Sequence, residues 1–139
     1  MRILGLDVGD KRIGVAVSDG LGLTAQGLTT IVRSDIKKDI ERLAAIIREH
    51  SIEKIIVGLP RNMNGTYGPQ AEKTKEFVKL LRKEIPLEVV FWDERLTTAL
   101  ARRTLLEGDV SRKKRREVID RMAAVVILQG FLDRGGSKG

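Results

Sequence analysis

RILGLDVGDKRIGVAVS, residues 2–18, contains two short apolar runs, RILGLD (2–7) and IGVAVS (13–18), separated by the polar segment VGDKR. Two such runs around a glycine-containing polar tip are typical of a β-hairpin. A third run, at residues 24–32, predicts another strand directly after them. We therefore expect the chain to begin with three antiparallel strands.

A helix and a buried strand are predicted to follow. Ser34 or Asp35 offers an N-cap, and apolar residues then recur at helical spacing up to His50. The run KIIVGL, residues 54–59, is continuously apolar, which is typical of a parallel strand buried on both faces. The chain is thus expected to change from antiparallel strands to a parallel arrangement.

The second half of the chain continues this alternation. Pro69 can open a helix that Pro86 ends, and LEVVFW, residues 87–92, predicts a fifth strand. Two further helices are predicted at about 97–107 and about 116–133. Together these segments predict an α/β fold with a five-stranded mixed sheet, antiparallel over its first three strands, and helices on both faces.

Length and composition exclude several classes of protein. With 139 residues, of which 42% are hydrophobic, we expect a single domain over residues 1–139, with residues 135–139 as a flexible tail. The chain has no cysteine and one histidine, which excludes disulfides, a thiol nucleophile and a thiolate zinc site. It shows neither a signal-peptide pattern nor a membrane-spanning apolar run, so a cytoplasmic location without a membrane partner is expected.

Charge points to a polyanionic partner. The chain has 26 Lys and Arg against 19 Asp and Glu, a net charge of +7. A surplus of this size favours nucleic acid or an anionic membrane surface. Aromatic residues make up only 4% of the chain, so extensive stacking on single-stranded bases is not expected.

Three acidic positions are candidates for a site, because sites in such sheets form outside the carboxyl ends of strands. Asp7 ends the first run, and its alternative role is a turn aspartate that accepts from a nearby amide. Asp93 and Glu94 end the fifth run, where alternation along the strand allows only one of them to face the site. Which of the two does so stays open at this point, and Glu94 could instead favour a helix N-terminus.

Asp120 is the third acidic position. It lies at the edge of an apolar stripe on the last predicted helix, and the small residues Ala123 and Ala124 would let this helix approach the sheet. The alternative is an ion pair with Arg116 or Arg121. Three carboxylates from distant segments would fit Mg²⁺ or Mn²⁺, and two such ions about 4 Å apart can activate water for phosphodiester cleavage.

Basic residues near these positions are candidate substrate contacts. Lys11 and Arg12 lie at the tip of the first hairpin, and a run of basic residues precedes Asp120 at the start of its helix, where the macrodipole disfavours cations and a phosphate would relieve the repulsion. The full set of predicted substrate contacts is Lys11, Arg12, Arg61, Asn62, Arg95, Arg112, Lys113, Lys114 and Arg115.

Four motifs together resemble the YqgF family, also called RuvX. They are GLDVGDKRIGVAVSD (5–19), IIVGLPRNMNGTYGPQA (55–71), WDERLTT (92–98) and IDRMAAVVILQ (119–129). The family has been assigned Holliday junction resolution and maturation of the end of pre-16S ribosomal RNA. The resemblance implies a ribonuclease H-like fold, a metal-dependent nuclease, and an acidic triad of Asp7, Glu94 and Asp120, which favours Glu94 over Asp93.

Two other functions remain open from the sequence. One is a nucleic-acid-binding or ribosome-assembly factor without efficient catalysis, and the other is a small ATP-binding protein of the actin and sugar-kinase type. Precursor ribosomal RNA and four-way DNA junctions are rival substrates, because phosphate contacts position a nucleic acid without identifying it. Junction resolution needs two symmetric cuts, which favours a two-fold homodimer.

Overall fold

The computed structural model describes residues 2–59, 68–93 and 112–134. Within them, five strands form a sheet in the order β3-β2-β1-β4-β5. β1 pairs antiparallel with β2, and β2 with β3, whereas β4 runs parallel to both β1 and β5. This is the mixed sheet that the sequence predicts. The strands are β1 (Arg2–Val8), β2 (Arg12–Ser18), β3 (Ala25–Val32), β4 (Ile52–Leu59) and β5 (Glu88–Asp93).

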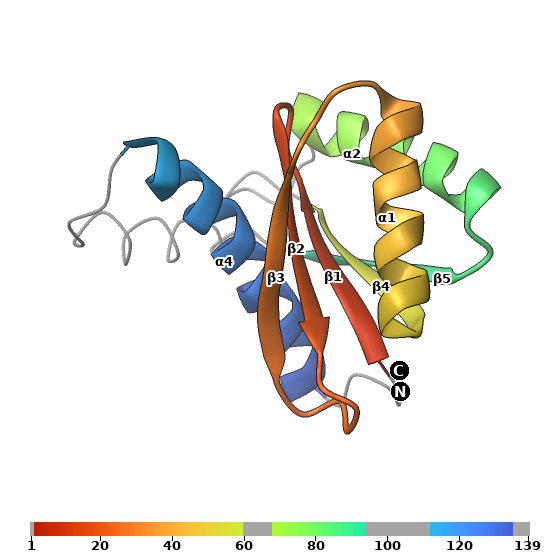
Figure 1. The fold of residues 1–139 in the computed structure, drawn as a ribbon, viewed down its shortest axis with the longest axis vertical. Coiled ribbons are helices and arrows are strands. Elements are labelled where there is room, and N and C mark those ends of the chain that lie inside the picture. Colours follow the sequence, from red (N-terminus) through yellow and green to blue (C-terminus); the bar gives the residue numbers. More distant parts are fainter. Residues whose placement is uncertain (1, 60–67, 94–111, 135–139) are drawn as a thin grey trace.

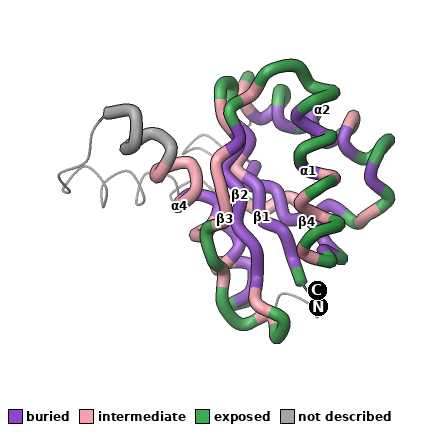
Figure 2. The backbone as a smooth tube through the Cα atoms, viewed as in Figure 1, coloured by how far each residue is buried: buried purple, intermediate pink, exposed green. Residues whose placement is uncertain are grey.

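Helices cover both faces of this sheet (Figure 1). α1 (Ile36–His50) and α2 (Pro69–Glu84) pack on one face, and α4 (Arg112–Asp133) packs on the other. Each face has its own buried apolar cluster, and the three central strands β2, β1 and β4 are buried over most of their length, whereas the edge strand β3 is mostly exposed or partly exposed (Figure 2). Among the described helices, none is both long and apolar enough to cross a bilayer.

Local chemistry explains where the first two helices begin and end. Asp35, rather than Ser34, is the N-cap of α1, and its carboxylate accepts a hydrogen bond from the Lys38 amide at 2.9 Å. Ser51 ends α1 in the left-handed region with φ 54°. Pro69 occupies the first turn of α2, where its missing N–H costs nothing.

The last helix begins earlier than predicted, at Arg112 instead of about residue 116. Lysine and arginine are good helix formers, so the basic run continues the helix toward its N-terminus instead of preceding it. The first turn of α4 contains no acidic residue. The helix predicted at about 97–107 lies outside the described residues.

Candidate active site on the α4 face of the sheet

Asp7 lies on the face of the sheet that α4 covers. Leu6 and Val8 on either side of it pack in the cluster below α1 and α2, and side chains alternate along a strand, so Asp7 points the other way. Its side chain is half-buried. The Gly9 amide donates to the Arg12 carbonyl at 2.9 Å and closes the hairpin.

Gly14 brings α4 down onto the sheet beside Asp7. It is the cross-strand partner of Asp7 in β2. A Cβ atom added to Gly14 would overlap the backbone oxygen of Asp120, because it would lie more than 1 Å closer to that oxygen than the 3.0 Å that real Cβ contacts essentially never fall below. The helix backbone therefore packs directly on this glycine. Asp7 lies directly opposite Gly14, and the Cβ positions of such a pair are about 5 Å apart. Since the Asp120 backbone packs on Gly14, Asp7 and Asp120 are neighbours.

Two more glycines continue this contact line across the first three strands. A Cβ atom on Gly5 would lie 2.8 Å from the Leu128 Cβ, and one on Gly27 would lie 2.8 Å from the Arg121 Cγ. Ala123 and Ala124 on the facing side of α4 are fully buried, as their small size led us to expect. The helix that bears Asp120 therefore packs directly on the strand backbone at these glycines.

Asp120 forms an ion pair with Arg12. The Arg12 Nε donates to the Asp120 Oδ2 at 2.5 Å, and the two side chains are 25% and 20% exposed. Arg12 is two residues before Gly14 and shares its face of β2. Of the partners that the sequence offered for Asp120, the Arg116 side chain lies outside the described part of the structure. The partner that the structure shows comes from a strand more than 100 positions away, which no local pattern could indicate.

The last residues of β5 show which of its alternating side chains face α4. Trp92 packs edge-on against Phe131 of α4 with ring centroids 6.0 Å apart, whereas Phe91 packs against the opposite cluster. Trp92 is thus partly buried and packs against the apolar cluster below α4. Glu94 lies outside the described residues. Within the described ranges, no group of three His, Asp or Glu side chains is placed to hold a metal ion.

The predicted substrate contacts differ in how far the structure describes them. Lys11 is exposed at the tip of the β1–β2 hairpin, and Arg12 beside it is paired with Asp120. The side chains of Arg61, Asn62, Arg95 and the run from Arg112 to Arg115 lie outside the described part of the structure, although the backbone of that run belongs to α4.

Contacts that the sequence did not reveal hold the tip of the β1–β2 hairpin in place. Arg33 donates to the Gly9 carbonyl at 2.7 Å, pairs with Asp39 at 3.4 Å, and stacks over the Phe77 ring at 5.1 Å. From α2, Gln70 donates to a β1 carbonyl at 3.2 Å. These residues come from separate elements, so only the folded chain shows that they support the strand end that bears Asp7.

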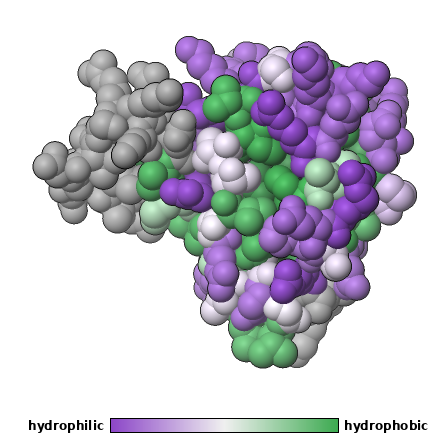
Figure 3. All heavy atoms as spheres, viewed as in Figure 1, coloured by the Kyte–Doolittle hydropathy of each residue, from purple (hydrophilic) through white to green (hydrophobic). Residues whose placement is uncertain are grey.

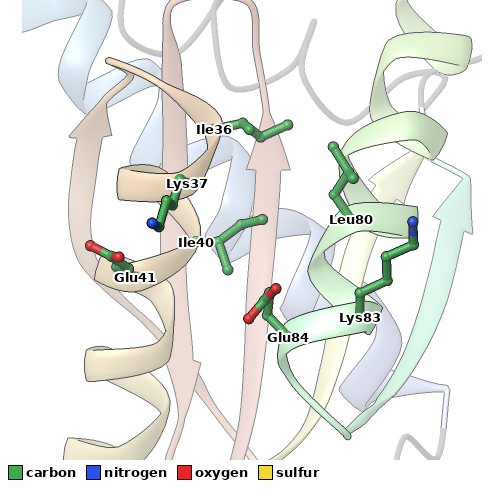
Figure 4. A pocket seen from close by; sticks show the side chains of 7 residues that line it. All are labelled: Ile36, Lys37, Ile40, Glu41, Leu80, Lys83 and Glu84. Atoms are coloured by element: carbon green, nitrogen blue, oxygen red, sulfur yellow. The ribbon is translucent and has the colours of Figure 1, made fainter.

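The opposite face of the sheet has a different character. A pocket of about 230 Å³ lies between α1 and α2, where Ile36, Ile40 and Leu80 form its apolar part and lysine and glutamate side chains surround them (Figure 4). The outer surface of these helices is largely hydrophilic, and apolar residues gather at the end of the molecule formed by the β2–β3 turn (Figure 3). Neither feature adjoins Asp7 and Asp120.

Comparison with known proteins agrees with this architecture. Residues 1–134 match the RuvX family, described as Holliday junction resolvase. A protein of Clostridioides difficile (strain 630) named "Putative pre-16S rRNA nuclease" is 64% identical over 132 residues, 95% of this chain and 94% of that protein. A protein of Moorella thermoacetica with the same name is 58% identical over 139 residues, 100% of this chain and 99% of that protein.

Solved structures with this fold include two junction resolvases. RuvC of T. thermophilus, in complex with a Holliday junction substrate, superposes with a TM-score of 0.60 and 15% identity, covering 99% of this chain and 97% of that one. The fowlpox virus Holliday junction resolvase gives a TM-score of 0.56 at 14% identity, covering 96% of this chain and 99% of that one. The fold is therefore ribonuclease H-like, and the chain belongs to the RuvX family of Holliday junction resolvases.

Proposed function

We propose that this chain is a metal-dependent nuclease that hydrolyses phosphodiester bonds in structured nucleic acid, with Asp7, Glu94 and Asp120 as its metal-binding and catalytic residues. The observation that supports this most directly is the seating of the Asp120 backbone on Gly14, the cross-strand partner of Asp7. It supports a site in which two half-buried carboxylates from distant segments lie close together at one end of the sheet, where positive charge is favourable.

The donor chemistry of this site fits a hard divalent cation. Asp7 and Asp120 supply carboxylate oxygens, which Mg²⁺ and Mn²⁺ prefer, and the chain has no cysteine that would favour a softer metal. When bound, such an ion would activate the attacking water and offset charge on the leaving oxygen. Asp7 and Asp120 would hold it, and their spacing would depend on the seating of α4.

Glu94 is the third residue in this proposal. Trp92 lies on the α4 side of β5, and alternation would put the residue two positions beyond it on that side if the backbone stays extended. Asp93 has the opposite parity, shared with Phe91. Strand alternation thus favours Glu94 over Asp93 independently of the family resemblance.

Basic residues around the carboxylates would bind the nucleic acid backbone. Lys11 is exposed next to the site, and α4 begins with a basic run that lacks an acidic neighbour in its first turn. We assign phosphate contacts to Lys11 and Arg12, to Arg61, Asn62 and Arg95, and to Arg112, Lys113, Lys114 and Arg115. Such contacts would give affinity that falls steeply with salt.

Two substrates follow from the proteins that this chain resembles. Close relatives are named for pre-16S rRNA and the family for Holliday junctions, so we propose processing of the pre-16S rRNA end, junction resolution, or both. Resolution would require two cuts related by symmetry, and hence a homodimer. RNA processing sets no such requirement.

The experiment that tests this function compares the two substrates directly. Wild type, Asp7→Asn and Asp120→Asn are incubated with a labelled four-way DNA junction and with precursor rRNA, each with Mg²⁺, with Mn²⁺ and with EDTA. We expect wild type to cut at least one substrate only with metal, and each variant to lose at least about a hundredfold in rate.

Asp35→Asn is the matched control, because asparagine caps a helix as well as aspartate does and the residue lies outside the site. It should cut at the wild-type rate. Circular dichroism and thermal unfolding establish that every variant is folded. Cleavage by Asp7→Asn at the wild-type rate, or no cleavage of either substrate by wild type, would contradict the proposal and favour a binding factor without catalysis.

A further inference from the structure

We propose that Arg12 is the internal counter-cation of the carboxylate site: it neutralises Asp120 when no metal is bound and leaves Asp120 when a divalent cation binds. This inference rests on the metal site proposed above. Its starting observation is the 2.5 Å contact between the Arg12 Nε and the Asp120 Oδ2, which joins the hairpin tip to the helix at the proposed site. Metal binding would then be an exchange of cations.

The Arg12–Asp120 pair is built differently from the other arginine–aspartate pair on the hairpin side. Asp39 is 1% exposed and also accepts the Ser34 amide at 3.1 Å, while its partner Arg33 has further contacts with a carbonyl and an aromatic ring. That pair is a fixed structural element. Among the described residues, Asp120 is the single side-chain partner of Arg12.

Partial exposure gives Arg12 the freedom to move. Its side chain is 25% exposed, and a long arginine stem can turn its guanidinium into solvent without opening the core. The contact uses one oxygen of the Asp120 carboxylate. Once released, the guanidinium would be next to the site and available for a backbone phosphate, which is the role assigned to it above.

Charge explains why the two cations should compete. Asp7 and Asp120 are neighbours and half-buried, so a positive charge close to them is favourable when the site has no ion. A divalent cation held by the same carboxylates would be a few ångströms from a guanidinium that stayed on Asp120. Screening by salt is weak for partly buried charges, so the repulsion between the two would oppose metal binding.

The test measures metal affinity without any nucleic acid. The dissociation constant for Mn²⁺ is determined by isothermal titration calorimetry for wild type, Arg12→Gln, Arg48→Gln and Asp7→Asn. We expect Arg12→Gln to bind Mn²⁺ about tenfold more tightly than wild type, because it removes the competing cation. Arg48, exposed near the end of α1, is the matched control for lost charge, and Arg48→Gln should bind like wild type.

Thermal unfolding gives a second measurement. In EDTA, Arg12→Gln should melt below wild type, because Asp120 has lost its counter-charge. The rise in melting temperature on adding Mn²⁺ should then be larger for Arg12→Gln than for wild type. Arg12→Met, which keeps the apolar stem and removes the charge, serves as the second variant if Arg12→Gln does not fold.

The outcomes separate this inference from the proposed function. If Asp7→Asn binds Mn²⁺ like wild type, or if neither wild type nor any variant binds it, the proposed metal site is wrong. The proposed exchange of cations is then wrong as well. If Asp7→Asn loses Mn²⁺ while Arg12→Gln binds it like wild type, or tenfold to a hundredfold more weakly, the site stands and the exchange is overturned. Weaker binding would instead make Arg12 an orienting partner of a ligand carboxylate.

Discussion

Replacing Gly14 with alanine should both destabilise the fold and separate the two carboxylates. The new Cβ atom would lie more than 1 Å closer to the Asp120 carbonyl oxygen than the shortest ordinary contact of 3.0 Å, and this oxygen belongs to the backbone. No side-chain rotation can remove that overlap, so α4 must withdraw from β2 by at least about 1 Å. Overpacking of this kind costs about 3 kcal/mol, or roughly 10 °C in melting temperature for a chain of this size.

The same displacement should weaken the site. A misplacement of about 1 Å can reduce catalysis about a hundredfold, and Mn²⁺ affinity should fall because the Asp120 carboxylate moves with the helix. The assays are thermal unfolding, calorimetric Mn²⁺ titration and cleavage by the folded protein below its melting temperature.

Gly20→Ala is the matched control for this prediction. A Cβ atom at Gly20 would meet no heavy atom within 4 Å, so this variant should be as stable as wild type or slightly more so, with unchanged Mn²⁺ affinity. If Gly14→Ala matched Gly20→Ala in stability and in metal affinity, α4 could not rest on Gly14, and the argument that brings Asp120 to Asp7 would fail.

Three further substitutions test the contacts around the sheet. Asp39→Asn should lower the free energy of unfolding by about 3 kcal/mol in urea, because it leaves the Arg33 charge without its buried partner; a loss below about 1 kcal/mol would contradict this. The Leu23 amide holds the pKa of Asp19 below its ordinary value, so wild type should be more stable than Asp19→Asn at pH 7, and the advantage should shrink as the pH falls below about 4; melting curves at several pH values would refute this if the difference stayed constant. Lys54→Met should change stability by less than about 1 kcal/mol, since methionine replaces a buried cation at similar volume, and a larger loss in the same urea assay would show that its pair with Glu88 matters.

Much of the fold was predictable because its signals are local. The five strands, the helix that ends at His50 and the helix that opens at Pro69 all occur where periodicity and end signals predict them. The predicted stripe on the last helix is correct as well, with Ala124, Ile127 and Leu128 fully buried. Only the start of that helix was placed too late, because a run of lysine and arginine has no apolar period to mark it.

The candidate site was predictable only in part. Asp7 at the end of a strand and Asp120 at the edge of an apolar stripe could be found from the sequence, since each has a signal within a few residues of itself. The partner of Asp120 could not, because it depends on which strand passes under the helix. The roles of Arg33 and Asp39 could not be predicted either, since Arg33 binds the hairpin tip at Gly9 and Asp39 holds Arg33 in place, and these contacts form only in the folded chain.

The amino-acid sequence by itself therefore determined the order of strands and helices and the acidic residues that could form a site, because hydrophobic period and strand ends are properties of neighbouring residues. The tertiary structure decided that Gly5, Gly14 and Gly27 line up under α4, that this puts Asp120 beside Asp7, and that Arg12 is the cation between hairpin and helix. The physical reason is that strand order and register bring distant backbone segments together, and close packing of a helix on bare glycine then fixes which charges must meet.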